Sequence, residues 1–136
     1  MKKWLVISLM ILFIASINFA EKKFSLNNLP AVVIKTVPTA GDTAVSPDLS
    51  EIKVVFSKEM FTHNSWSFAH FAKEISPEFT GQIQYLDDKK TCVAKVKLKP
   101  GKTYAIWLNY GNHQGFRDKN LKPAIPYLLV FRTADQ

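Results

Sequence analysis

Two of the three histidines lie in one aromatic stretch, residues 62–71, with the sequence THNSWSFAHF. Histidine is a common metal ligand and general base, so this stretch is the first candidate for chemistry. His63 and His70 are seven residues apart, which places them on opposite faces of a strand and two turns apart on a helix. His113 falls in a separate loop, and no cysteine or carboxylate has ligand spacing beside any of the three. The spacing therefore predicts no zinc site.

The same stretch has the alternation of a β-strand with one bulky face. Trp66, Phe68 and His70 form one row, and the residues at 67, 69 and 71 form the other. We expect Trp66 and Phe68 to pack between two sheets, as aromatic residues of β-sandwiches do. The stretch is then structural.

Nucleophile and acid–base signatures are also missing from the sequence. No Gly-x-Ser-x-Gly turn is present, and Cys92, the only cysteine, is predicted to face inward without a histidine partner. Glu74 and Glu78 could be drawn as an acid–base pair, but they flank Pro77 in what we expect to be an exposed loop.

Phosphate and calcium sites are equally unsupported. The five glycines are scattered and form no phosphate-binding loop. Asp87, Asp88 and Asp118 are conceivable calcium ligands, but a hard cation needs several converging oxygens, and two adjacent acids among lysines are typical of a turn. We predict no catalytic residue, cofactor or metal, and the chain is not expected to be an enzyme.

The first twenty residues have the layout of a secretory signal peptide. Lys2 and Lys3 precede an almost wholly apolar run at 4–17, and Ala20 stands before a charged segment. The run is shorter than the roughly 20 residues of a spanning helix. Asn18 is unfavourable three positions before the cut, so an uncleaved membrane anchor remains the alternative. We expect an exported protein, whether periplasmic, cell-surface or secreted.

The charge and the cysteine count limit the partners and the fold. Without Lys2 and Lys3, the formal net charge falls from +7 to +5, which favours solubility and weak attraction to anionic material. Export and the lack of a concentrated basic surface argue against nucleic acid. Cys92 cannot form an internal disulfide, so the fold must depend on an apolar core.

From residue 33 onward the chain alternates apolar and polar residues between turn signals. Residues 21–32 show no period and are expected to be a linker, and residues 58–64 could form one helical turn. The clearest alternation is the second arm of a hairpin with its turn at 87–90. Its core row is Cys92, Ala94, Val96 and Leu98, and its solvent row is Lys95, Lys97 and Lys99.

About seven short strands over a hundred residues predict an all-β, antiparallel sandwich of the Ig-like kind, here at 33–134. Pro100 and Gly101 form a tight turn, and Tyr104 opens the next strand. A tyrosine there often returns its hydroxyl to the preceding backbone as a tyrosine corner.

The order of several short motifs resembles the bacterial Ig-like domain first described in S-layer proteins. A Pro-containing strand and a Gly-Asp loop are followed by a strand that ends in Phe-Ser and a methionine. A Leu-x-Pro-Gly-x-x-Tyr turn and a closing Phe-x-Thr come later. The matching residues are Phe56, Ser57, Met60, Pro100, Gly101, Tyr104, Phe131 and Thr133. The resemblance implies a non-catalytic module of exported or cell-surface proteins.

The loop at 110–122 is the candidate binding surface, because it combines aromatic rings with positive charge before the last strand. An envelope protein or an anionic wall polymer is the expected partner, and the lysine row of the hairpin is the rival surface. An ordinary loop in which Phe116 closes the end of the sandwich is the alternative. So are a small exported enzyme or metal-binding protein, and an accessory subunit of a larger envelope complex. The candidate residues are Tyr110, His113, Phe116, Arg117 and Lys119.

Overall fold

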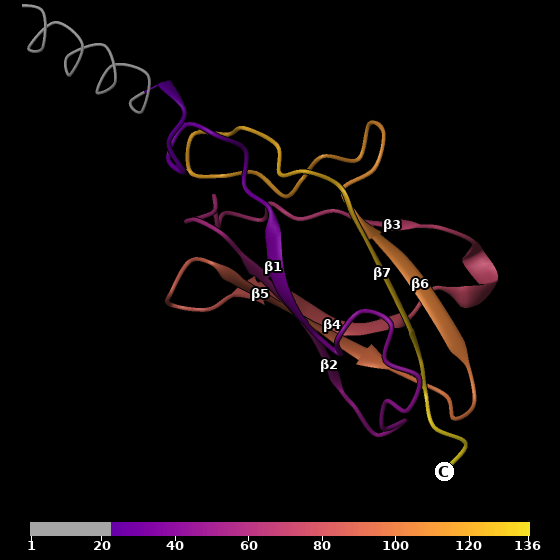
Figure 1. The fold of residues 1–136 in the computed structure, drawn as a ribbon. Coiled ribbons are helices and arrows are strands. Elements are labelled where there is room, and N and C mark those ends of the chain that lie inside the picture. Colours follow the sequence, from indigo (N-terminus) through magenta and orange to yellow (C-terminus); the bar gives the residue numbers. More distant parts are fainter. Residues whose placement is uncertain (1–22) are drawn as a thin grey trace, which may run out of the picture.

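The computed structural model describes residues 23–136, and the predicted signal peptide lies outside the described residues. Two antiparallel sheets face each other (Figure 1). The first has the order β1-β2-β5-β4 and the second the order β3-β6-β7. Their bounds are β1 (Val33–Val37), β2 (Glu51–Phe56), β3 (Phe68–His70), β4 (Glu78–Tyr85), β5 (Thr91–Lys97), β6 (Thr103–Leu108) and β7 (Tyr127–Arg132). This architecture confirms the predicted all-β sandwich.

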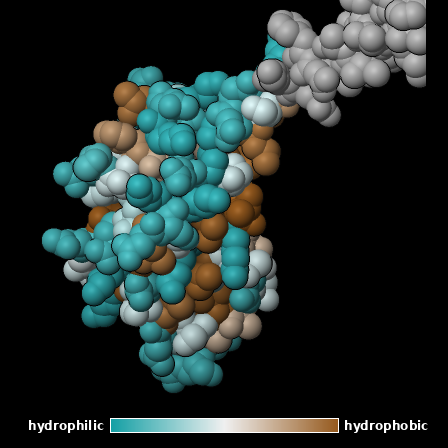
Figure 2. Space-filling view, turned by 90° about the vertical axis from the view of Figure 1, so that its left-hand side faces the viewer, coloured by the Kyte–Doolittle hydropathy of each residue, from teal (hydrophilic) through white to brown (hydrophobic). Residues whose placement is uncertain are grey.

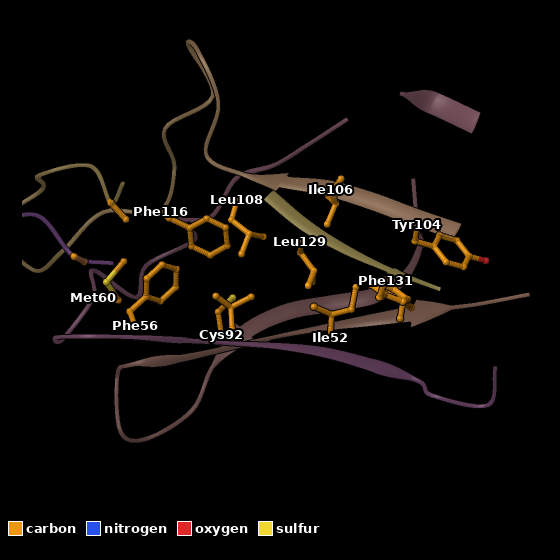
Figure 3. Close-up of a cluster of buried hydrophobic side chains, with 14 of the residues drawn as sticks. Ile52, Phe56, Met60, Cys92, Tyr104, Ile106, Leu108, Phe116, Leu129 and Phe131 are labelled. Atoms are coloured by element: carbon orange, nitrogen blue, oxygen red, sulfur yellow. The ribbon is translucent and has the colours of Figure 1, made fainter. Parts of the chain in front are cut away.

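The core lies between the two sheets and is built from alternate residues of each strand (Figure 3). Ile52, Val54 and Phe56 of β2 are buried, whereas Lys53 between them is exposed. Because successive side chains of a strand point to opposite faces, this alternation buries one row per strand. Other core side chains come from β5, β6, β7 and the loops: Met60, Cys92, Val96, Tyr104, Ile106, Leu108, Phe116, Leu129 and Phe131.

Two local expectations are wrong. Residues 58–64 contain no helical turn, because their backbone bonds to other segments: Met60 N–H donates to the Lys89 carbonyl and Phe61 N–H to that of Arg117. A 3₁₀ turn, η1 (Lys73–Ile75), forms later instead. Glu78 does not lie in a loop, since it begins β4 opposite Lys97 of β5.

The lysine row of the hairpin is on the outer face of the first sheet. Lys95 and Lys97 are exposed, while Cys92 and Ala94 of the same strand are fully buried. Since β5 lies between β2 and β4, these lysines are in the middle of the sheet and do not protect an edge.

The loop after β1 joins the last strand side by side and in the same direction. Val45 forms a parallel bridge with Thr133. Four backbone hydrogen bonds of 2.7–3.1 Å connect residues 41–45 with residues 130–134. The described chain enters at one end of the sandwich, and the C-terminus lies at the other (Figure 1).

Tyr104 and Thr133 together close the turn between β5 and β6. The Tyr104 hydroxyl accepts a 2.7 Å hydrogen bond from the Lys99 N–H, the contact expected of a tyrosine corner. Its ring is buried and stacks on Phe131, with centroids 5.3 Å apart. The Thr133 hydroxyl donates to the Lys99 carbonyl and accepts from the Lys102 N–H. The final Thr of the Phe-x-Thr motif thus fastens this turn to the end of β7.

We expect Tyr104→Phe to lower the free energy of unfolding by about 0.5–1.5 kcal/mol, the net contribution of one hydrogen bond. Urea denaturation midpoints would measure the change. Tyr110→Phe is the matched control, because Tyr110 is exposed and its ring contact survives the change. Equal midpoints for the Tyr104 variant and the native chain would contradict the corner.

Candidate functional site

The loop between β6 and β7 has a fixed base at Asn109. The Asn109 side chain is buried and donates to the carbonyls of Phe116 and Ala124 at 2.8 and 3.1 Å. Its oxygen accepts from the Phe116 N–H at 2.9 Å. Asn109 has a φ of 60°, a left-handed conformation that asparagine tolerates better than most residues. One side chain therefore joins the start, middle and end of the loop.

A buried ion pair holds the far side of the same loop. Lys58 Nζ lies 3.0 Å from Asp118 Oδ2, and the two side chains are only 9% and 2% exposed. Lys58 also donates to the carbonyls of Asn27 and Leu29, at 2.7 and 3.0 Å. The pair thus attaches part of the segment that we expected to be a linker, in which Ala31 is also buried.

Asp118 is kept ionised by its hydrogen bonds. Burial alone would raise its pKa, but hydrogen bonds from Lys58 Nζ and from the N–H groups of Lys122 and Asn120 reverse this, and the net pKa is lowered. With its carboxylate already occupied by these donors, Asp118 is a structural anion. Among residues 23–136, no three His, Cys, Asp or Glu side chains come close enough together to hold a metal ion.

Four of the five candidate binding residues are exposed on this fixed loop. Tyr110 is 52% exposed and stacks on Trp107, with centroids 4.9 Å apart. Tyr110 and His113 exchange two backbone hydrogen bonds of 2.8 Å. Arg117 donates through Nε to the Gln114 carbonyl, and Lys119 Nζ lies 4.0 Å from Glu59 Oε2.

Phe116 is not part of that surface. Its side chain is fully buried and packs against Phe56 and Phe68, with centroids 5.1 and 5.2 Å away. A ring between the two sheets cannot contact a partner, so the structure places Phe116 in the core (Figure 3). The reason is its position between the Asn109 hydrogen bonds, which turn the Phe116 backbone toward the sandwich.

The histidines are more connected than their spacing indicates. His70 and His113 line the same shallow hollow, although they come from β3 and from the loop after β6. His70 Nδ1 is hydrogen-bonded to Ser76 Oγ at 2.7 Å, whereas His63 packs near Phe61. Trp66 is half-buried against the core rather than enclosed by the two sheets.

The adjacent acids at the hairpin turn have a local structural role. Asp88 accepts hydrogen bonds from the Thr91 hydroxyl and from the N–H groups of Lys90 and Thr91. The Thr91 hydroxyl is the largest cause of the lowered pKa of Asp88, followed by the Lys90 N–H. The carboxylate is occupied in shaping the turn.

A family model described as a bacterial Ig-like domain matches residues 27–133. The chain belongs to the bacterial Ig-like domain family. The match begins before β1, in the segment that Lys58 attaches, and it includes both the corner tyrosine and the closing Phe-x-Thr. The resemblance read from the sequence is thereby confirmed.

Two similar solved structures share the fold of this bacterial Ig-like domain. A structure titled "Structure of surface layer protein SbsC, domains 1-6" has a TM-score of 0.53 and 16% identity, and the match covers 81% of this chain. "Crystal structure of the S-layer protein rSbsC(31-844)" has a TM-score of 0.50 and 17% identity, with 79% of this chain covered. In both cases the match spans only 14% of the other chain. No curated protein sequence matches this chain.

The surface of the domain is mixed in character. Figure 2 shows one side on which hydrophilic residues predominate and hydrophobic residues are exposed in patches between them. Within residues 23–136, no helix has the length and apolar character needed to cross a membrane.

Proposed function

We propose that this bacterial Ig-like domain is an exported, non-catalytic module that binds a partner at the cell envelope. Family membership supports this proposal, and so do the surface-layer proteins whose domains share its fold. The signal-peptide layout of residues 1–20 is the basis for export. The expected partner is an anionic wall polymer or an acidic protein surface, and not a nucleic acid.

The observation that carries the proposal is a rigid loop with exposed cations. Asn109 and Asp118 fix the backbone of residues 110–122 from both sides, while Arg117 and Lys119 remain exposed. A fixed loop loses little conformational entropy when a partner binds, so modest electrostatic attraction can produce specific binding.

We expect the full chain to be captured on isolated envelope material at low ionic strength and released by high salt. The Debye length falls from about 10 Å at 0.1 M to about 3 Å at 1 M, which screens exposed charges. Replacing both Arg117 and Lys119 by alanine should weaken capture without changing the melting temperature, because exposed pairs contribute only about 0–1 kcal/mol. Co-sedimentation and thermal melts measure the two effects.

The control is the outer sheet face, with Lys95, Lys97 and Lys99 replaced by glutamine. This variant removes more positive charge than the loop variant does, so it tests whether charge alone is sufficient. If it abolishes capture while the loop variant is captured normally, the working surface is the sheet and the loop assignment fails.

A further inference from the structure

A groove follows one open side of the sandwich, between the edge strands β3 and β4. Phe68 of β3 and Phe79 of β4 meet on this side, with ring centroids 5.0 Å apart. A hollow of about 700 Å³ is lined by Trp66 and by the C-terminal part of β4, residues 81–85, which includes Ile83. A second hollow of about 440 Å³ shares Trp66 and Ile83 and continues to His113. The two hollows therefore adjoin at Trp66 and Ile83.

The groove has a fixed wall around Trp66. The Tyr85 hydroxyl donates to the Ser65 carbonyl at 2.6 Å, and the Ser65 hydroxyl donates to the Gly115 carbonyl. Burial, and to a lesser degree Cys92, raises the pKa of Tyr85, so its hydroxyl keeps its proton. Gly115 packs so closely that a Cβ there would lie 2.1 Å from the Trp66 carbonyl oxygen. The backbone at Ser65 and Trp66 is therefore held by β4 on one side and by Gly115 on the other.

The groove offers aromatic surface beside neutral hydrogen-bonding groups. Trp66 lines the hollow of about 700 Å³ together with three amide residues, Gln82, Gln84 and Asn64. Each amide can both donate and accept hydrogen bonds. Asp87 and Lys89 at one end carry opposite charges, so these two give the groove no net charge. Pyranose sugars match this chemistry, because they have C–H faces that pack on aromatic rings and hydroxyl groups that both donate and accept.

Two other occupants fit the groove less well. An extended peptide would add to a free strand edge, but β3 has only three residues and the register of β4 shifts between Phe79 and Ile83. Short and irregular edges resist strand addition. An anionic polymer would be drawn to exposed cations, such as Arg117 and Lys119 of the loop, rather than to this groove.

We propose that the groove between β3 and β4 binds a neutral glycan chain of β-linked hexoses or N-acetylhexosamines, with Trp66 as the stacking platform and Gln82 and Gln84 as hydroxyl partners. The residues assigned to this site differ from Arg117 and Lys119, so the two proposals can be tested independently. Its binding should be insensitive to salt, because no net charge takes part.

Isothermal titration calorimetry of the full chain with a β-1,4-linked N-acetylglucosamine tetramer, and with the corresponding glucose tetramer, tests the proposal. We expect at least one of the two to bind with a Kd of about 1 mM or tighter. The double variant Gln82→Ala and Gln84→Ala should weaken binding at least about tenfold, through the loss of two hydrogen bonds. Both residues are exposed, so the variant should keep the native melting temperature.

The matched control replaces Lys95 and Lys97 on the neighbouring strand by glutamine, and it should bind like the native chain. The Arg117 and Lys119 variant should also bind normally, which separates this site from the envelope capture proposed above. Absence of heat with both tetramers would overturn the proposal. Binding that the glutamine-to-alanine variant retains, or that high salt abolishes, would overturn it as well.

Discussion

Lys58→Met is expected to lower the free energy of unfolding by about 3–5 kcal/mol, the usual cost of leaving one partner of a buried ion pair alone. Methionine keeps most of the length of the side chain, so the loss reports mainly on charge and hydrogen bonding rather than on a cavity. The variant leaves the Asp118 carboxylate buried without its cation, and it leaves the carbonyls of Asn27 and Leu29 without their donor. Urea denaturation near neutral pH measures the loss.

The effect should depend on pH with a defined sign. The pKa of Asp118 is lowered in the folded chain, so its contribution to stability is present above the unfolded pKa of about 4 and is lost as the pH falls through the folded value. Below that pH, the native chain contains a buried lysine beside a neutral acid. The difference in stability between the native chain and Lys58→Met should therefore shrink in acid.

Two further variants make the result interpretable. Lys97→Met removes an exposed lysine and should change stability by no more than about 0.5 kcal/mol. Combining Lys58→Met with Asp118→Asn should cost less than the sum of the single changes, because residues in contact couple. Additive losses, or a loss that is the same at every pH, would show that Lys58 does not pair with ionised Asp118.

Asn109→Ala is the second change for which we expect a large loss, of at least about 3 kcal/mol. It removes the partners of three buried backbone groups, the N–H and carbonyl of Phe116 and the carbonyl of Ala124, and each unpaired group costs about 1–3 kcal/mol. Alanine also tolerates the left-handed backbone at this position poorly. Denaturation midpoints and hydrogen exchange of the Phe116 amide would measure the effect.

Asn109→Gly separates the two causes, because glycine accepts the positive φ but makes no side-chain hydrogen bond. We expect it to recover only part of the loss. Asn112→Ala, an exposed asparagine of the same loop, is the control and should be nearly neutral. A glycine variant as stable as the native chain would mean that backbone strain, rather than hydrogen bonding, accounts for the alanine result.

The sheets could be predicted from the sequence because their signal is local. The row of Ile52, Val54 and Phe56 reappears unchanged in the core, since period two is set by the geometry of the strand itself. The same row continues to Lys58 and Met60, and both are buried. A buried lysine needs an anionic partner. The position of Lys58 in the same alternating row as the core residues was therefore the sequence signal for the ion pair.

The shape of the binding loop could not be predicted in this way. It is set by Asn109 and Asp118, whose contacts join segments without any periodic pattern. Phe116 is an aromatic residue in a positively charged loop, which favours a binding role. The hydrogen bonds of its backbone nevertheless direct the ring inward. The groove beside Trp66 depends on the meeting of β3 and β4, two strands from opposite sheets. Only the packing of the sheets brings their edges together.

The parallel contact between residues 41–45 and 130–134 has a mechanical consequence. The two ends of the domain lie at opposite ends of the sandwich, so a stretching force between them is directed along β1 and β7 (Figure 1). The four backbone hydrogen bonds between these segments are then loaded in shear and must break together rather than one after another. Such an arrangement resists extension far better than a hairpin pulled open from its end, and it would allow the domain to transmit tension along a surface without unfolding.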